Sequence, residues 1–233
     1  TKALTYMSQQ PKSNDGTYVT VPTGAMSAYF CLAYDLFTVQ DNGRLDLDLM
    51  GRLKHPDQFQ GARHELFAEA TCLRAGFKIE HEDERDGLKR HAEFIATHKK
   101  TGQKVSVEAK SKHRPGVLGR PGQAPDPKEC DLSFGQLLND AIAKNPPHPL
   151  VVFLDTNVPP ETARYFFQLD EKRIPTKINA LLDRVKKHHG GADTINLAVF
   201  TNLPHHYAKE NEVDPPKNLI AVRSDRAKIP AQH

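Results

Sequence analysis

Val105-Ser-Val-Glu-Ala-Lys-Ser111 is the stretch that decides the fold of this 233-residue chain. Its apolar residues alternate with polar ones, and this period of two is typical of a half-buried β-strand. Glu108 and Lys110 therefore point to the same face of the strand, about 7 Å apart at a rise of roughly 3.4 Å per residue. The stretch predicts a strand that presents a carboxylate and an ammonium group side by side.

A second strand is predicted directly upstream, over residues 91–98, and residues 99–102 form a short hairpin loop that ends in glycine. Two registers are open. If the turn is centred on the second and third loop residues, Glu93 lies directly across from Glu108. If it is centred on the third and fourth, Glu93 faces Lys110. Either register places all three side chains on one face of the sheet.

This arrangement of charges suggests a function, because two carboxylates that face each other across a ladder repel. A divalent cation removes the conflict, since hard ions such as Mg²⁺ bind one or two carboxylates together with water and phosphate oxygens. A lysine beside such a ligand can hold the attacking water or the charge of a phosphate. The alternative interpretation is a solvent-exposed strand face with dispersed charges.

A helix is predicted over residues 58–75, where apolar residues recur at helical spacing and Gly76 ends the helix. Glu65 lies at the rim of the apolar stripe, and Glu69 lies nearer to the core. A carboxylate at the rim can reach the edge of the sheet and complete a metal site, directly or through water. An ordinary flanking charge is the alternative for both residues.

With these residues the chain resembles the PD-(D/E)xK nuclease superfamily, which includes many restriction enzymes, RecB-like nucleases and Holliday-junction resolvases. The resemblance rests on Gly61-x-x-x-Glu65 with Leu73-x-x-Gly76, then Glu93, then Glu108-Ala-Lys110. The motif departs from the family pattern at His91-Ala-Glu93, which stands where Pro-Asp is usual.

The resemblance implies a role for each matched residue. Glu93, Glu108 and the helix carboxylate Glu65 become metal ligands in the catalytic centre, and Lys110 becomes the catalytic lysine. The implied cofactor is Mg²⁺, which Mn²⁺ can replace. The implied substrate is nucleic acid, most simply DNA.

The order of the remaining elements agrees with this resemblance. A helix is predicted over residues 132–144, and the continuous apolar run 150–155 predicts a strand that is covered on both faces. We therefore expect an α/β protein with a restriction-endonuclease-like αβββαβ core, in which helices flank a central mixed sheet. Further helices are expected at 161–169 and 177–188, and further strands at 194–201 and 219–223.

Two regions are expected in the chain. Residues 1–57 form a partly helical N-terminal extension, and residues 58–233 form the nuclease-like α/β domain, with its core at 58–155 and C-terminal α/β additions at 156–233. The most apolar part of the extension, residues 25–37, predicts a buried helix that is too short to span a bilayer.

The loop 111–122 leaves the motif strand directly and is basic and rich in glycine and proline, so no regular element is expected there. Its basic side chains suit phosphate contacts, which position nucleic acid without reading its sequence. These candidates are Lys112, His113, Arg114 and Arg120. Gln136, on the following helix, matches half of a substrate-contacting motif of RecB-like members, because Asp140 stands where tyrosine is usual. A mobile surface loop and a solvent-facing glutamine are the alternatives.

Composition sets the outer limits. A net charge of +3 means that any surface for nucleic acid must be local, and a mean hydropathy of −0.60 predicts a soluble protein with no membrane partner. Three widely spaced cysteines without a C-x-x-C motif indicate a reducing, cytoplasmic compartment and argue against structural zinc. The histidine pairs at 188–189 and 205–206 lie next to Gly190 and Pro204, which interrupt regular structure, and this predicts surface positions. The sequence leaves open whether the protein forms a homo-oligomer.

Three hypotheses follow. The first is a Mg²⁺-dependent phosphodiesterase that acts on DNA, as an endonuclease or an exonuclease. The second is a catalytically silent nuclease-fold module that binds nucleic acid or a protein partner. The third is a structural α/β domain whose charges are coincidental.

Overall fold

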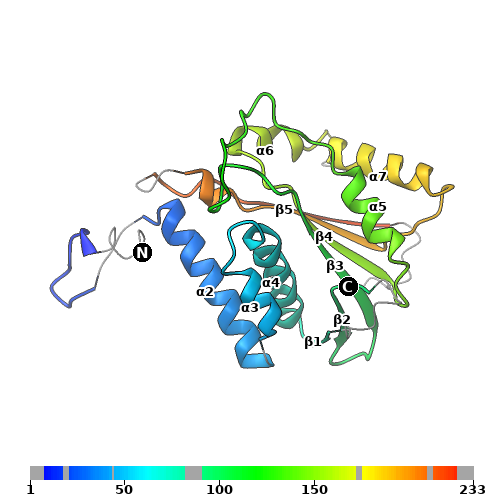
Figure 1. Cartoon of the computed structure of the whole chain (residues 1–233), viewed down its shortest axis with the longest axis horizontal. Helices are drawn as coiled ribbons and strands as arrows, with labels where there is room; N and C mark the ends of the chain where they lie inside the picture. Colours follow the sequence, from blue (N-terminus) through cyan, green and yellow to red (C-terminus); the bar gives the residue numbers. More distant parts are fainter. Residues whose placement is uncertain are drawn as a thin grey trace.

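The computed structural model describes residues 8–17, 21–43, 45–81, 91–171, 175–208 and 212–224, and within them six strands pair in chain order into one sheet (Figure 1). The strands are β1 (Phe77–Glu80), β2 (Phe94–His98), β3 (Lys104–Ser111), β4 (Leu150–Asp155), β5 (Leu197–Asn202) and β6 (Asn218–Arg223). β2 pairs antiparallel with β1 and β3, β4 pairs parallel with β3 and β5, and β6 pairs antiparallel with β5. The predicted mixed sheet is confirmed.

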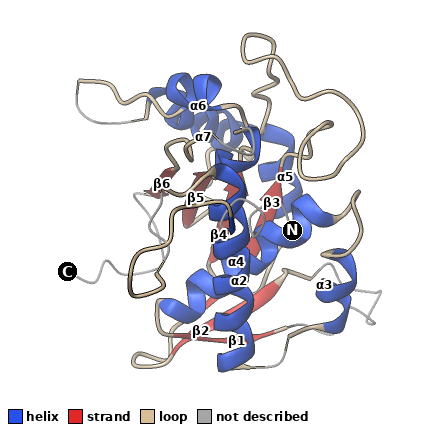
Figure 2. Ribbon diagram, turned by 90° about the vertical axis from the view of Figure 1, so that its left-hand side faces the viewer, coloured by secondary structure: helices blue, strands red, loops and turns tan. Residues whose placement is uncertain are grey.

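Helices cover both faces of this sheet (Figure 1, Figure 2). One side carries α2 (Gly24–Asn42), α3 (Leu47–Arg52) and α4 (Phe59–Arg74), and the other carries α5 (Gly135–Ala143), α6 (Pro160–Phe166) and α7 (Thr176–His188). A short 3₁₀ helix, η1 (Pro204–Tyr207), follows β5. The order from α4 to β4 is α-β-β-β-α-β, as predicted, and the α/β class is confirmed. The predicted extension and additions also include residues outside the described ranges.

The hairpin between β2 and β3 fixes the register of the motif residues. Phe94 pairs with Val107, and the Glu93 N–H donates to the Val107 carbonyl at 3.1 Å. The four-residue loop closes at Gly102, whose φ of 70° is a left-handed conformation that favours glycine. This register places Glu93 beside Glu108, which is the first of the two arrangements that the sequence left open.

Successive side chains of β3 point to opposite faces of the sheet, and the two faces differ in their surroundings. Val105 and Val107 pack with Ala68 and Cys72 of α4 in one apolar cluster. Glu108, one position along, therefore points to the opposite face, where α5, α6 and α7 pack on the sheet. All six residues of β4 are buried, as expected for a strand that is covered on both faces.

The sequence predicted a buried helix over residues 25–37, but the helix found there, α2, is buried on one face only. The Thr23 hydroxyl caps it by accepting from the Met26 N–H at 3.4 Å, and its inner face packs on α4 through Val39. Because α2 is the outermost helix of its layer, only one of its faces can be covered. The aromatic residues of α2 that are left exposed are Tyr29, Phe30, Tyr34 and Phe37.

Two further findings concern the described part of the chain. It contains no helix that is both long enough and apolar enough to cross a membrane. Its three cysteines, Cys31, Cys72 and Cys130, are all free thiols.

Candidate functional site

Glu108 lies at the centre of the candidate site and is fully buried. Its Oε1 atom is 2.5 Å from the Lys110 Nζ and 2.6 Å from the Lys144 Nζ. Its Oε2 atom is buried as well and has no hydrogen-bond partner among the described residues. The Oε1 atom is likewise buried without a hydrogen bond, so ion pairs with two ammonium groups are what hold this carboxylate.

Glu93 completes a cluster of four charges. Its Oε1 atom lies 3.5 Å from the Lys144 Nζ and 3.9 Å from the Lys110 Nζ. Two carboxylates and two ammonium groups carry no net charge, so the repulsion predicted from the sequence is offset by lysines in this structure. Glu93, Glu108 and Lys110 are brought together as predicted, and their roles stay predictions.

Lys144 is the member of this cluster that the sequence analysis missed. It follows the last residue of α5 and reaches back over the sheet to the carboxylate pair. Leu137, Ala141 and Lys144 are spaced by four and three residues, which places them on one helix face. Ala141 is fully buried against the sheet. That spacing is the signal that could have directed attention to this lysine.

The burial of Glu108 affects its charge. Burial raises the pKa of Glu108 because a carboxylate loses hydration in the core, and the ammonium groups of Lys110 and Lys144 oppose this increase. The neighbouring charge of Glu93 adds to it. The negative charge on Glu108 therefore depends on a cation in contact with it.

An open cavity of about 430 Å³ lies beside this cluster. Its polar and charged lining residues are Arg52, Glu65, Glu93, Lys110, Ser111, Lys112 and His113. Gly61 of the predicted motif also lines it, and a Cβ at this position would lie 3.0 Å from the His113 Nε2. The glycine thus lets the start of the basic loop approach α4 closely.

Glu65 reaches this cavity but does not join the carboxylate pair. Its two oxygens accept from the Arg52 guanidinium at 2.7 and 2.9 Å, a bidentate ion pair. Asp48 contacts the same arginine at 2.8 Å. Among the described residues no group of three or more His, Cys, Asp or Glu is placed to hold a metal ion. An arginine from α3 thus binds the Glu65 carboxylate away from the carboxylate pair, and the role of Glu65 as a third metal ligand stays a prediction.

The residues that are present nevertheless fit a hard divalent cation. Mg²⁺ in phosphoryl-transfer sites is held by one or two carboxylates, while water and substrate phosphate provide the other ligands. Glu93 and Glu108 provide two carboxylates, and Glu108 Oε2 is a buried acceptor without a hydrogen-bond partner. Such an atom costs free energy unless a cation or donor reaches it.

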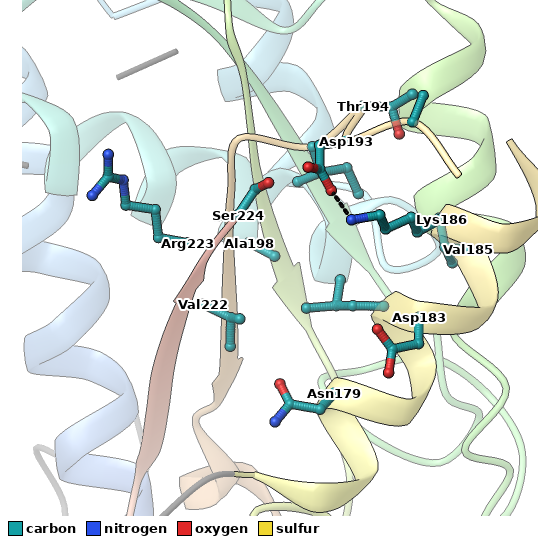
Figure 3. Close-up of a pocket in the computed structure, with 13 residues that line it drawn as sticks. Asn179, Asp183, Val185, Lys186, Asp193, Thr194, Ala198, Val222, Arg223 and Ser224 are labelled. Atoms are coloured by element: carbon teal, nitrogen blue, oxygen red, sulfur yellow. Dashed lines mark ion pairs between the residues drawn. The ribbon is translucent and has the colours of Figure 1, made fainter. Parts of the chain in front are cut away.

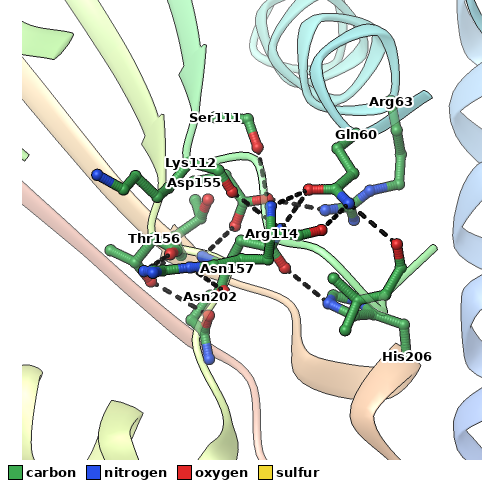
Figure 4. A network of polar contacts seen from close by, with 12 residues as sticks. Gln60, Arg63, Ser111, Lys112, Arg114, Asp155, Thr156, Asn157, Asn202 and His206 are labelled. Atoms are coloured by element: carbon green, nitrogen blue, oxygen red, sulfur yellow. Dashed lines mark hydrogen bonds and ion pairs between the residues drawn. The ribbon is translucent and has the colours of Figure 1, made fainter. Parts of the chain in front are cut away.

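Arg114 corrects the predicted set of phosphate contacts. Its side chain is buried, and its guanidinium donates to the carbonyls of Asp131, Asn157 and Thr156 at 2.7, 3.1 and 3.3 Å (Figure 4). Its backbone N–H donates to Gln60 Oε1 at 2.7 Å. The long loop leaves backbone carbonyls inside the protein, and the five donors of an arginine satisfy them. Arg114 therefore holds the loop in place and does not face a substrate.

The other predicted contacts are divided between the cavity and the surface. Lys112 lines the cavity and also pairs with Asp131 at 2.6 Å, and His113 is exposed beside it. Arg120 lies farther along the loop, in a turn where its N–H donates to the Val117 carbonyl at 3.1 Å.

Gln136 is exposed on α5, and its amide donates to Asp140 Oδ1 at 2.7 Å. It lines a separate hollow between α5 and α7. The structure therefore does not bring Gln136 to the carboxylate cluster.

A polar network closes the carboxyl end of the parallel strands (Figure 4). Asp155, at the end of β4, is fully buried and pairs with Arg63 of α4 at 2.8 Å. The His206 Nε2 lies 2.7 Å from Asn157 Oδ1, and His205 is only 1% exposed. The surface position predicted for this histidine pair is therefore wrong, because η1 folds the pair against the network. These groups join α4 to the sheet.

A second cavity, of about 490 Å³, lies between α7 and strands β5 and β6 (Figure 3). It contains none of the residues predicted from the sequence. Its Lys186 and Asp193 form an ion pair at 2.6 Å, which leaves their charges paired with each other. The cavity beside Lys110 is the better candidate for chemistry, because Glu93 and Lys110 of the carboxylate–lysine cluster line it.

No protein-family model matches this chain, and the curated proteins contain no match either. The geometry of the carboxylate–lysine cluster is therefore what supports a function.

Proposed function

We propose that this protein is a metal-dependent nuclease that hydrolyses phosphodiester bonds in DNA, on a restriction-endonuclease-like core. The observation that carries the proposal is the convergence of Glu93, directly before β2, with Glu108 and Lys110 of β3 beside one open cavity. The order of elements from α4 to β4 supports the proposed core.

Glu93 and Glu108 would hold Mg²⁺, which Mn²⁺ could replace. When bound, the metal supplies Lewis-acid polarisation of the phosphodiester and lowers the pKa of a water ligand. Glu108 is suited to the task because its position in β3 is fixed by pairing with β2 and β4, so its carboxylate is preorganised.

Lys110 and the loop after β3 would have different roles toward the substrate. The Lys110 side chain is 20% exposed and lines the cavity, so its ammonium can stabilise negative charge that develops on the reacting phosphate. Lys112 and His113 line the same cavity and would position neighbouring phosphates. In this proposal the residues of the sheet carry out the hydrolysis, and the loop residues position the nucleic acid.

One observation favours the second candidate function, a silent nuclease-fold module that binds nucleic acid or a protein. The two lysines already balance the charges of the two carboxylates. A site without net charge can be stable with no metal at all. Cleavage is the property that separates the two functions.

The test is incubation of the protein with supercoiled plasmid, linear duplex and single-stranded DNA, in Mg²⁺, in Mn²⁺ and in EDTA. We expect cleavage with either metal and none in EDTA. Glu108→Gln should remove cleavage because it removes a ligand, whereas Glu129→Gln, an exposed control, should retain it. Full cleavage by folded Glu108→Gln would refute the site. Binding without cleavage by the unaltered protein would favour the silent module.

A further inference from the structure

Lys144 occupies an unusual place for a surface lysine. It caps the C-terminus of α5, and Asn145 behind it adopts a φ of 46° as the chain turns away. The side chain is only 24% exposed, and its ammonium forms ion pairs with two carboxylates, Glu108 at 2.6 Å and Glu93 at 3.5 Å. Its ammonium therefore lies where these two acidic groups converge.

The charges of the cluster restrict what else can bind there. Glu93 and Glu108 are already balanced by Lys110 and Lys144, and both ammonium groups contact the same oxygen of Glu108. A divalent cation added to this cluster would leave an excess of two positive charges within a few ångströms. Like charges at such distances repel strongly where solvent is largely excluded. One ammonium group must therefore withdraw when a metal binds.

The structure indicates which lysine withdraws. Lys110 is fixed in β3 by pairing with Leu154 of β4, and it lines the cavity, where a phosphate would give it a new partner. Lys144 lies outside any strand, at the start of the loop that follows α5. Its long side chain can turn to solvent without moving the sheet.

We propose that Lys144 is a built-in competitor for the divalent cation: it balances the charge of Glu93 and Glu108 in the metal-free protein, and a metal binds only by displacing it. This inference rests on the proposed metal site and adds a control on when that site is loaded. A metal brought by a phosphate-rich substrate would enter more easily than free metal, because the phosphate also draws Lys110 away from Glu108.

The first experiment measures Mn²⁺ affinity by calorimetry, with no nucleic acid present. Lys144→Met should bind Mn²⁺ more tightly by a factor on the order of 10, because an adjacent opposite charge lowers the cation affinity of a carboxylate by about that factor or more. Lys186→Met is the matched control: it removes a lysine from a 2.6 Å ion pair on α7 and changes the net charge equally. Its Mn²⁺ affinity should be unchanged. Equal or weaker affinity in Lys144→Met, or no binding by any of the three proteins, would overturn the proposal.

A second measurement uses the unaltered protein and does not depend on the variant folding. Acetylation of each lysine by acetic anhydride is followed by mass spectrometry, with and without saturating Mn²⁺. Mn²⁺ should increase the acetylation rate of Lys144 several-fold and leave that of Lys186 unchanged. A Lys144 rate that is unchanged or lower with Mn²⁺ would contradict displacement.

These readouts keep the two proposals separate. Tighter Mn²⁺ binding by Lys144→Met without DNA cleavage by any form would support the competitor and refute the nuclease. Metal-dependent cleavage by the unaltered protein, with Mn²⁺ affinity unchanged in Lys144→Met, would support the nuclease and refute the competitor.

Discussion

At the scale of single residues, Lys110 and Lys144 contact the same oxygen of Glu108 but have different surroundings. Only Lys110 is fixed in the sheet and lines the cavity. If its charge acts mainly on the transition state, Lys110→Ala should lower the single-turnover cleavage rate by a factor on the order of 10² to 10³. DNA affinity, measured in Ca²⁺ to prevent turnover, should change far less.

The control for this prediction lies in the loop. Lys112→Ala combined with Arg120→Ala should weaken DNA binding and reduce its salt dependence, while the chemical step is nearly preserved. If Lys110→Ala weakened binding as strongly as cleavage, Lys110 would be a phosphate anchor and its assigned role would be wrong.

Arg114 gives a prediction about stability. Arg114→Met leaves two buried carbonyls and one partly buried carbonyl without their donor, so unfolding in urea should show a loss of about 3 kcal/mol. Arg120→Met, in the same loop, should stay within about 0.5 kcal/mol of the unaltered protein. Folded Arg114→Met should bind DNA with unchanged affinity. A purely DNA-binding defect at full stability would return Arg114 to the substrate-contacting set.

These two arginines show what the sequence could and could not predict about the site. Alternation along β3 was enough to bring Glu108 and Lys110 to one face, because a strand fixes side-chain direction with a period of two. A loop has no such period, so Arg114 and Arg120 looked equivalent although one is buried. Lys144 was missed because its position depends on how α5 packs on the sheet.

At the scale of elements, α4 carries two glutamates with opposite environments. Glu65 is paired with Arg52, whereas Glu69 is only 4% exposed and has the His81 Nε2 at 3.4 Å. Burial raises the pKa of Glu69 to about 7, and the charges of Glu65 and Asp46 add to the increase. The sequence had placed Glu69 nearer to the core than Glu65, which the structure confirms.

The pH dependence of stability follows from this pKa. The folded chain keeps the Glu69 proton up to about pH 7, whereas the unfolded chain loses it near the ordinary value of 4.5. The folded state binds more protons in this window, so stability falls as the pH rises from about 4.5 to 7. Glu69→Gln removes the ionisation and should be more stable than the unaltered protein at pH 8, by up to about 3 kcal/mol. The gain should vanish near pH 4.

Urea unfolding at several pH values measures this difference, with the exposed Glu129→Gln as the control that should show none. A gain of the same size at pH 4 and pH 8 would mean that packing, and not ionisation, explains the effect.

The boundaries of other elements show where local pattern was insufficient. The helix predicted from residue 132 begins at Gly135, because Asp131 accepts from the Ser133 N–H at 2.8 Å and holds a turn there. Strand β4 was predictable in full, since an unbroken apolar run between prolines and a polar segment has few other solutions. The outer face of α2 was not, because hydrophobicity alone does not tell which neighbours a helix has.

At the scale of the whole molecule, two sets of contacts join distant parts of the chain. Arg63 of α4 pairs with buried Asp155 at the end of β4. Helices α2 and α3 pack Val39 and Leu49 against Leu66 of α4. The N-terminal helices thus cover the outer side of the helix whose inner side covers the sheet.

The last prediction concerns residues 1–57, which the sequence predicted to be a partly helical extension separate from the α/β domain. A chain that begins at Gln58 loses the apolar cover of α4 and the ion pairs Arg52–Glu65 and Arg74–Asp35. Uncovering several core side chains costs about 2–5 kcal/mol each, which approaches the whole stability of about 5–15 kcal/mol of a typical protein. We expect this chain to lack a cooperative thermal transition and a near-UV circular dichroism signal.

A chain that begins at Val21 keeps α2 and α3 and should melt within a few degrees of the full protein. If the chain from Gln58 melted equally well, α4 would not depend on α2 and α3, and residues 58–233 would be an independent domain.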